Sequence, residues 1–212
     1  MSAHELRRGP AADAIRRHRL VVILRRIEPR ELLLSLAGEL AEAGVRVFEV
    51  TLDTASGADD LAALRTELRT RDDGPFTVGA GTVLTPAQLG AAVDADADFA
   101  VAPVLDLEIQ RAAIDAGLPF VPGGLSPTEI ATAWTAGATF VKLFPASAAG
   151  PAMVRELRGP LPDIQLIATG GIDDSNARDF LDAGAAAIGI GGAIARADAA
   201  ERRALVRMVD RS

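Results

Sequence analysis

The chain has 212 residues, of which 49% are hydrophobic and 24% charged, and its formal net charge at pH 7 is -7. These proportions are typical of a soluble globular protein. The acidic balance opposes the clustered positive surface with which proteins bind nucleic acid, so we expect no nucleic-acid partner. Cysteine is absent and the only histidines are His4 and His18, which excludes disulfides and thiol nucleophiles and leaves little for a catalytic triad or a histidine-based metal site.

The first 20 residues carry charges throughout and contain no apolar stretch of signal-peptide or membrane-span length. We therefore expect a cytoplasmic protein with no membrane partner. Within this segment, residues 5–18 predict a helix that precedes the first strand.

Beyond this helix, short apolar runs alternate with longer amphipathic segments along the whole chain. Several amphipathic segments begin with Ser, Thr or Asp near a proline and end on Ala-Gly, as helices do before a strand. Eight strands are predicted, at residues 20–25, 46–52, 76–81, 98–103, 119–123, 139–144, 164–170 and 186–191.

Eight strand and helix repeats predict an α/β fold, the (β/α)8 or TIM barrel, with the extra N-terminal helix over residues 5–18 closing its bottom. A doubly wound open sheet is the alternative, but its G-x-G-x-x-G motif is missing after the first strand. No linker or change in composition divides the chain, so we expect residues 1–212 to form one domain.

In such a barrel the functional residues lie at the carboxyl ends of the strands. These ends come from widely separated segments, and the barrel would bring them to one face. The residues expected there are Arg25, Glu49, Thr51, Asp53, Thr82, Pro103, Lys142, Phe144, Thr169, Gly170, Gly171, Gly191 and Gly192.

Lys142, in the run FVKLFPA, is the only lysine among 22 basic side chains, the others all being arginine. An amine can form an imine with a carbonyl, whereas a guanidinium stays protonated and cannot. The apolar neighbours Phe140 and Leu143 predict a dry environment that favours the neutral amine. Lys142 is therefore the candidate nucleophile; the alternative is a structural lysine whose stem is packed and whose ammonium reaches water.

Glu49 lies in VFEVTLD, the pattern of a buried strand, where an unpaired carboxylate is costly. Alternation along the strand places Glu49, Thr51 and Asp53 on one face and Val50 and Leu52 on the other, so the polar set should face the top of the barrel. Glu49 is the candidate general acid and base beside the lysine, and a structural ion pair with an arginine is the alternative.

The runs ATGGID and IGIGGAIA end the last two predicted strands. Their glycine pairs allow backbone amides to approach an anion, and phosphate sites recur at this place in barrels, although tight turns are the alternative. At the end of the third strand Thr82 offers a hydroxyl donor. A helix-capping role suits Thr85 better, because a proline follows it.

Five segments in order, GVRVFEVTLDT, VGAGTVLTPAQL, FVPGGLSPTE, FVKLFPAS and IATGGI, resemble motifs of the class I 2-keto-3-deoxy-6-phosphogluconate (KDPG) aldolases, a family that includes 4-hydroxy-2-oxoglutarate aldolase activity. The resemblance extends over residues 20–195. It implies a homotrimeric (β/α)8 lyase that cleaves a 2-keto-3-deoxy-6-phospho sugar acid to pyruvate and glyceraldehyde 3-phosphate, without a metal or another cofactor.

The same resemblance implies a role for each matching residue. Lys142 resembles the Schiff-base lysine and Glu49 the residue that transfers protons. Thr82 resembles the residue that binds the pyruvate carboxylate, and Pro103 and Phe144 resemble the walls of the pocket.

Three departures from the family pattern bear on the substrate. Asp53 stands where many KDPG aldolases have an arginine, and a carboxylate there would repel the substrate carboxylate. The run VVILRRIEP resembles the ILRG of the 2-keto-3-deoxy-6-phosphogalactonate branch, so we expect Arg25 to bind that carboxylate instead. Ala193 replaces a serine near the phosphate and Val104 replaces a glycine of the pocket, which makes an unphosphorylated 4-hydroxy-2-oxo acid an alternative substrate.

Two other functions stay open at this point. Asp53 and Ala193 are compatible with a catalytically inactive barrel that binds sugar phosphates. The other open function is that of an isomerase, which would use Glu49 as a base and form no imine. The phosphorylated gluconate and galactonate substrates differ only at C4, and the sequence does not distinguish them.

Overall fold

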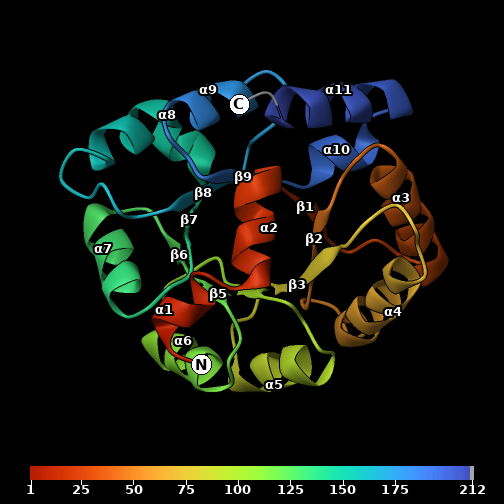
Figure 1. Cartoon of the computed structure of the whole chain (residues 1–212), viewed down its shortest axis with the longest axis horizontal. Helices are drawn as coiled ribbons and strands as arrows, with labels where there is room; N and C mark the ends of the chain where they lie inside the picture. Colours follow the sequence, from red (N-terminus) through yellow and green to blue (C-terminus); the bar gives the residue numbers. More distant parts are fainter. Residues whose placement is uncertain (211–212) are drawn as a thin grey trace.

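The structure, a computed structural model, describes residues 1–210. One parallel sheet curves into a barrel, with most of the helices arranged around its outside (Figure 1). All the predicted strands are present, several of them shorter than predicted. The strands are β1 (Leu20–Leu24), β2 (Val47–Thr51), β3 (Thr77–Gly81), β4 (Ala100–Val101), β5 (Phe120–Val121), β6 (Gly123–Gly124), β7 (Val141–Leu143), β8 (Leu166–Thr169) and β9 (Ala187–Ile190).

The barrel closes through residues 119–124. We predicted one strand over residues 119–123, and the structure has two short strands here, β5 and β6. The division falls at Pro122, which has no N–H to donate. The carbonyls of Pro119 and Val121 accept hydrogen bonds from the β4 side, while those of Phe120 and Pro122 accept them from the β7 side. The sheet of residues 1–210 therefore has no open edge, and the alternative of an open doubly wound sheet is wrong.

Three of the helices that cover the barrel begin with a side-chain cap of the predicted kind. Thr85, Asp106 and Ser126 each accept a backbone N–H from the first turn of the helix that follows. No helix within residues 1–210 is long and apolar enough to cross a membrane. The covering helices are α3 (Arg30–Glu42), α4 (Gly57–Arg69), α5 (Pro86–Asp94), α6 (Leu107–Asp115), α7 (Pro127–Thr135), α8 (Ala146–Leu157), α9 (Ala177–Asp182), α10 (Gly192–Arg196) and α11 (Ala199–Asp210).

The N-terminal segment contains two helices, α1 (Ala3–Leu6) and α2 (Pro10–His18), where we predicted one over residues 5–18. The break arises because Gly9 adopts an extended backbone and Pro10 starts a new helix at its first position. Helix α2 lies across the end of the barrel in Figure 1, and Ile15 belongs to the hydrophobic core inside it. The segment therefore closes the bottom of the barrel, as predicted.

The strands separate two hydrophobic cores, one inside the barrel and one between the strands and the helices. Val50 on β2 and Leu52 directly after it belong to the outer core, whereas Glu49 and Thr51 are buried on the opposite face. The predicted alternation is thus confirmed. Polar side chains are directed inward at the top of a barrel whose bottom is filled by apolar ones.

Candidate active site

A cavity of about 670 Å³ lies at the carboxyl ends of the strands, on the side of the barrel opposite α2. Segments that are far apart in the sequence meet at this cavity. The roles of their residues in binding and catalysis stay predictions. Its wall includes every predicted catalytic and substrate-binding residue: Arg25, Glu49, Thr82, Pro103, Lys142, Phe144, Thr169, Gly170, Gly171, Gly191 and Gly192.

Lys142 is the central residue of β7 and is directed into the cavity while its neighbours Val141 and Leu143 belong to the outer core. Its side chain is only 6% exposed. The Nζ atom lies 5.2 Å from the centre of the Phe144 ring, which covers one side of it. The sole lysine of the chain is therefore held in a mostly apolar and nearly dry position, as the sequence predicted.

Glu49 on β2 faces the same cavity and is 2% exposed. Burial raises the pKa of this carboxyl, and the positive charges of Lys142 and Arg25 oppose that increase without cancelling it. Its Oε1 atom is buried and has no hydrogen-bond partner within residues 1–210. A carboxyl in this state is suited to accept and return protons.

Gly81, at the end of β3, provides the space that Glu49 occupies. A Cβ atom at position 81 would overlap the Glu49 carboxylate. Sterics therefore explain why the run VGAG ends in glycine: a larger residue at position 81 would displace Glu49, the candidate proton-transfer group.

Thr82 follows β3 with a φ of 58°, a left-handed backbone conformation that is rare for a β-branched residue. It lines the cavity, whereas Thr85 caps α5 by accepting the Gln88 N–H. The structure thus gives the capping role to Thr85 and leaves the Thr82 hydroxyl at the cavity wall. On β8, the buried Thr169 fills the space that a side chain at Gly189 would need.

Arg25 emerges from β1 at the mouth of the cavity, with 56% of its side chain exposed. Its Nε and Nη2 atoms donate to Oδ2 of Asp53 at 3.1 and 2.9 Å, and Nε of Arg26 lies 3.1 Å from the same oxygen. Burial tends to raise the pKa of Asp53, but hydrogen bonding and the charges of the two arginines outweigh it and lower the pKa. The negative charge that we expected to repel a substrate carboxylate is therefore offset by two positive ones.

Arg196 also lines the cavity, and the sequence predictions missed it. Its Nη1 atom lies 2.8 Å from the place that a Cβ atom on Gly192 would occupy, so the guanidinium folds back over the last glycine pair. It forms no hydrogen bond or ion pair with another residue of the described chain. The four-residue spacing between Gly192 and Arg196, one helical turn, is the signal by which it could have been found.

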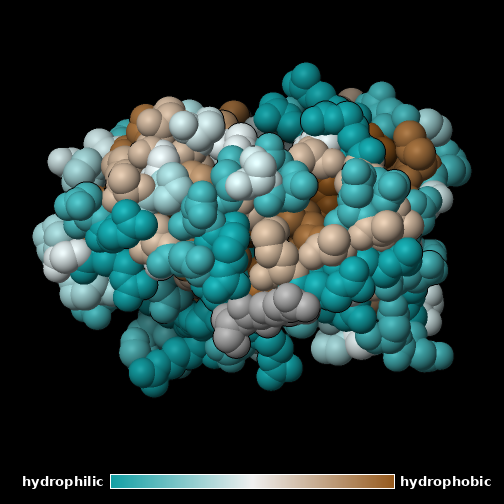
Figure 2. Space-filling view, turned by 90° about the horizontal axis from the view of Figure 1, so that it is seen from above, coloured by the Kyte–Doolittle hydropathy of each residue, from teal (hydrophilic) through white to brown (hydrophobic). Residues whose placement is uncertain are grey.

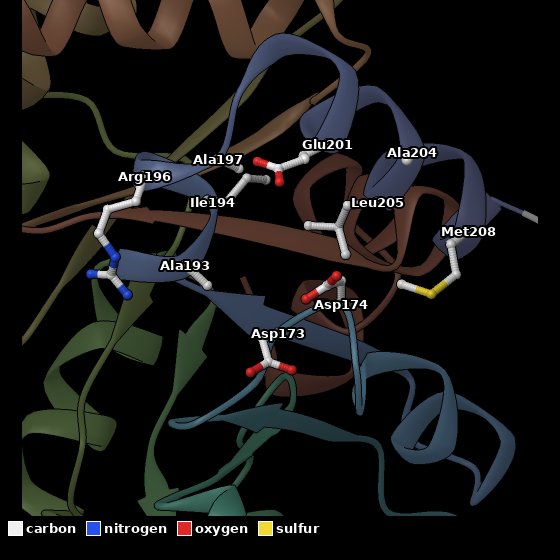
Figure 3. A pocket seen from close by; sticks show the side chains of 10 residues that line it. All are labelled: Asp173, Asp174, Ala193, Ile194, Arg196, Ala197, Glu201, Ala204, Leu205 and Met208. Atoms are coloured by element: carbon white, nitrogen blue, oxygen red, sulfur yellow. The ribbon is translucent and has the colours of Figure 1, made fainter.

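A second cavity, of about 610 Å³, adjoins the first beneath α10 and α11 and shares Asp173, Ala193 and Arg196 with it (Figure 3). In this view Arg196 points away from Glu201 on α11. Hydrogen bonds from Ser175 lower the pKa of Asp173, whose carboxylate is engaged in the turn before α9.

Seen from the side of α8, α9 and α11, the surface is mostly hydrophilic, with apolar side chains visible between the polar ones (Figure 2).

The chain is similar to several bacterial enzymes named as aldolases of 2-dehydro-3-deoxy sugar acids. The chain is 40% identical to the 2-dehydro-3-deoxy-phosphogluconate aldolase of Pseudomonas aeruginosa over 151 residues, which is 70% of this chain and 66% of that enzyme. It is 35% identical to the 2-dehydro-3-deoxy-6-phosphogalactonate aldolase of Escherichia coli K12, over 84% of this chain and 85% of that enzyme.

Among solved structures, the KDPG aldolase of Legionella pneumophila, in which pyruvate is captured as a covalent carbinolamine, superposes with a TM-score of 0.81 at 28% identity. The superposition covers 96% of this chain and 98% of that one. The family model for KDPG and KHG aldolases matches residues 12–210. The resemblance found in the sequence is thus confirmed, and the chain is a lyase that belongs to the KDPG and KHG aldolase family.

Proposed function

We propose that the protein is a class I aldolase that forms a Schiff base on Lys142 and cleaves a 2-keto-3-deoxy-6-phospho sugar acid of the KDPG type to pyruvate and glyceraldehyde 3-phosphate. One observation carries the proposal: the sole lysine is buried in the same cavity as a buried glutamate whose pKa is raised. The names of the relatives and the covalent carbinolamine in the Legionella enzyme support the same chemistry.

The first half of the reaction joins substrate and enzyme. Nζ of Lys142 attacks the C2 carbonyl, and the former carbonyl oxygen takes up a proton to give a carbinolamine. Glu49 then donates a proton to this hydroxyl, which leaves as water, and a protonated imine forms. A carboxyl whose pKa is raised by burial holds a proton at a higher pH than an exposed one and is therefore suited to this step.

The second half breaks the carbon–carbon bond. The Glu49 carboxylate, through a water, accepts the proton of the C4 hydroxyl, and the electrons of the C3–C4 bond move to the iminium nitrogen. The aldehyde departs and an enamine of pyruvate remains. Glu49 returns a proton to C3, and water then hydrolyses the iminium to release pyruvate and the free amine of Lys142.

The two ends of the substrate have different partners in this proposal. Arg25 binds the C1 carboxylate, with Thr82 as a further donor. Pro103, Phe144 and Thr169 form the walls, and all of these residues line the cavity. The phosphate lies beside the backbone of Gly170, Gly171, Gly191 and Gly192, where the Arg196 guanidinium adds a positive charge.

The proposal is tested by trapping the imine. Treatment with pyruvate and borohydride should reduce the imine to a stable secondary amine, and peptide mass spectrometry should place the added mass on Lys142. Untreated protein and protein treated with borohydride alone are the controls. If a known class I aldolase is labelled under the same conditions and this protein is not, the Schiff-base mechanism is wrong.

The Arg196 side chain is expected to determine whether phosphate is bound. Arg196→Gln should raise KM for the phosphorylated substrate about tenfold or more, because a charge-assisted hydrogen bond is lost. Saturation by pyruvate, which lacks the phosphate end, should not change. Arg178→Gln is the matched control, because Arg178 pairs with Asp182 on α9, outside the cavity. If KM for the phosphorylated substrate and the half-saturating pyruvate concentration rise equally, Arg196 does not bind the phosphate.

The second candidate substrate is the galactonate epimer. Two observations favour it: an arginine follows β1 at the cavity, and the match to the E. coli enzyme covers 84% of this chain. Pyruvate release should be compared for both phosphorylated epimers and for 4-hydroxy-2-oxoglutarate. If only 4-hydroxy-2-oxoglutarate is cleaved, the proposed phosphate site is wrong.

We also propose that the reaction needs no metal. The support is that within residues 1–210 no three His, Cys, Asp or Glu side chains come together as metal ligands. Protein dialysed against a chelator should keep its full rate, and restoration of a lost rate by one divalent ion would contradict the proposal.

We propose a homotrimer as the assembled form. In its support, Leu84, Val104, Leu107 and Leu125 are exposed on the loops or helix starts that follow β3, β4 and β6, a position at which exposed apolar groups favour burial between subunits. Sedimentation equilibrium should give three times the chain mass of 22.0 kDa, and a monomer would reject the proposal.

We further propose one domain over residues 1–212 and a cytoplasmic location. The closed sheet and its two cores support a single unit. The cysteine-free composition suits a reducing compartment. A single cooperative unfolding transition is the expected result for one domain. Recovery of the protein in the cytosolic fraction is the expected result for a cytoplasmic location.

A further inference from the structure

Asp53 and Arg25 meet because β1 and β2 are neighbours in the barrel. In their parallel register, Ile23 is paired with Glu49. Two residues further along each strand, the chain reaches Arg25 and Thr51, and Asp53 follows on the same side of β2. The carboxylate and the guanidinium are thus brought together at the rim of the cavity that holds Lys142.

The contacts between them leave part of the guanidinium free. Nε and Nη2 of Arg25 are both engaged by Oδ2 of Asp53, whereas Nη1 forms no hydrogen bond with any residue in 1–210. The side chain of Asp53 is 12% exposed, so it is an anchored partner, while the Arg25 side chain reaches solvent at the cavity mouth. One edge of the guanidinium is held and the other is available to a ligand.

We propose that Asp53 is a positioning residue that orients the guanidinium of Arg25 toward the carboxylate of a 2-oxo acid. The inference rests on the proposed function, in which Arg25 binds that carboxylate. An exposed arginine without a partner samples many rotamers, and this freedom is lost when a ligand binds. A guanidinium that is already held loses less, so the ligand binds more tightly.

Arg26 explains why an acidic residue is compatible with an anion site. Its Nε atom lies 3.1 Å from the same oxygen of Asp53. Two guanidinium groups and one carboxylate leave one net positive charge at the rim, so the group still attracts an anion. The arrangement offers oriented donors without a negative potential at the place where the carboxylate would bind.

The test uses pyruvate alone, because an enzyme that forms its enamine exchanges the methyl hydrogens of pyruvate with D2O, which NMR can follow. Asp53→Asn should raise the half-saturating pyruvate concentration roughly three- to tenfold, the cost of ordering one long side chain, and leave the maximal exchange rate within about twofold. Pyruvamide, which lacks the negative carboxylate, should saturate equally in both proteins. Asp60→Asn is the matched control, because Asp60 accepts a hydrogen bond from Arg30 outside the cavity.

A double-mutant comparison separates this role from a structural one. If Asp53 acts through the arginine, Asp53→Asn should add nothing to the half-saturating concentration in an Arg25→Ala background. Unchanged or tighter saturation in Asp53→Asn, or additive effects of the two changes, would overturn the proposal. Asp53→Ser provides the same comparison if the asparagine variant does not fold. If Arg25→Ala alone leaves saturation unchanged, the role of Arg25 in the proposed function fails instead.

Discussion

Lys142→Arg is expected to abolish aldol cleavage, with a loss in kcat on the order of 10⁴-fold or more, as for other enzymes that lose their nucleophile. The substitution keeps the positive charge but removes the amine, and a guanidinium cannot form the imine that withdraws electrons from the C3–C4 bond. Pyruvate release from the phosphorylated substrate, measured by a coupled assay, checks the rate. Borohydride should no longer add pyruvate to the protein.

A larger planar group in a site this buried can disturb packing, so Lys142→Met is the companion variant. Methionine has a similar length and no charge, and it should leave the circular dichroism spectrum and the cooperative unfolding of the protein intact. Substantial turnover by folded Lys142→Arg would instead favour an isomerase-type reaction with Glu49 as the base. A lack of turnover in the unaltered protein would favour an inactive binding barrel, although the ion pairs of Asp53 remove one of the two reasons for that alternative.

Glu49→Gln is expected to lower kcat by about 10²- to 10⁴-fold, the usual contribution of a positioned acid or base. Glutamine has nearly the same shape and can still occupy the space opposite Gly81, but it cannot transfer a proton. The rate at which borohydride traps pyruvate should fall as well, because dehydration of the carbinolamine also needs this proton. Turnover close to that of the unaltered protein would exclude Glu49 from proton transfer.

The same variant should show the cost of burying the carboxyl. Burial raises the folded-state pKa of Glu49 above its ordinary value, so the folded protein binds this proton more tightly than the unfolded chain. Its contribution to the free energy of unfolding is present below the ordinary pKa of a glutamate and is lost as the pH rises through the raised value. Urea unfolding should therefore show Glu49→Gln gaining stability relative to the unaltered protein over that interval.

Glu156→Gln, an exposed position on α8, is the control for this measurement. It tests whether any loss of a carboxylate gives the same pH dependence. A stability difference for Glu49→Gln that does not vary with pH would contradict a raised pKa.

The architecture could be predicted because its signals are local. The signals for strands and for helix caps act within a few residues of the chain. Thr85 caps a helix as predicted, and Asp106 and Ser126 are caps of the predicted residue types. The errors arose where a local break interrupted a continuous pattern. Gly9 and Pro10 divided the predicted N-terminal helix, and Pro122 divided the fifth strand while its carbonyls still closed the barrel.

For the site, the sequence alone predicted the candidate nucleophile, the buried glutamate and the family, because a single lysine and a carboxylate in an apolar strand are unusual wherever they occur. Only the tertiary structure decided how the charges around them are paired. Arg25 and Asp53 are 28 residues apart, and their contact depends on the adjacency and register of β1 and β2. The sequence predictions missed Arg196, and the structure shows its guanidinium beside Gly192 at the cavity. Electrostatic interactions depend on distance in space, and neighbouring strands and helices set that distance after the chain has folded.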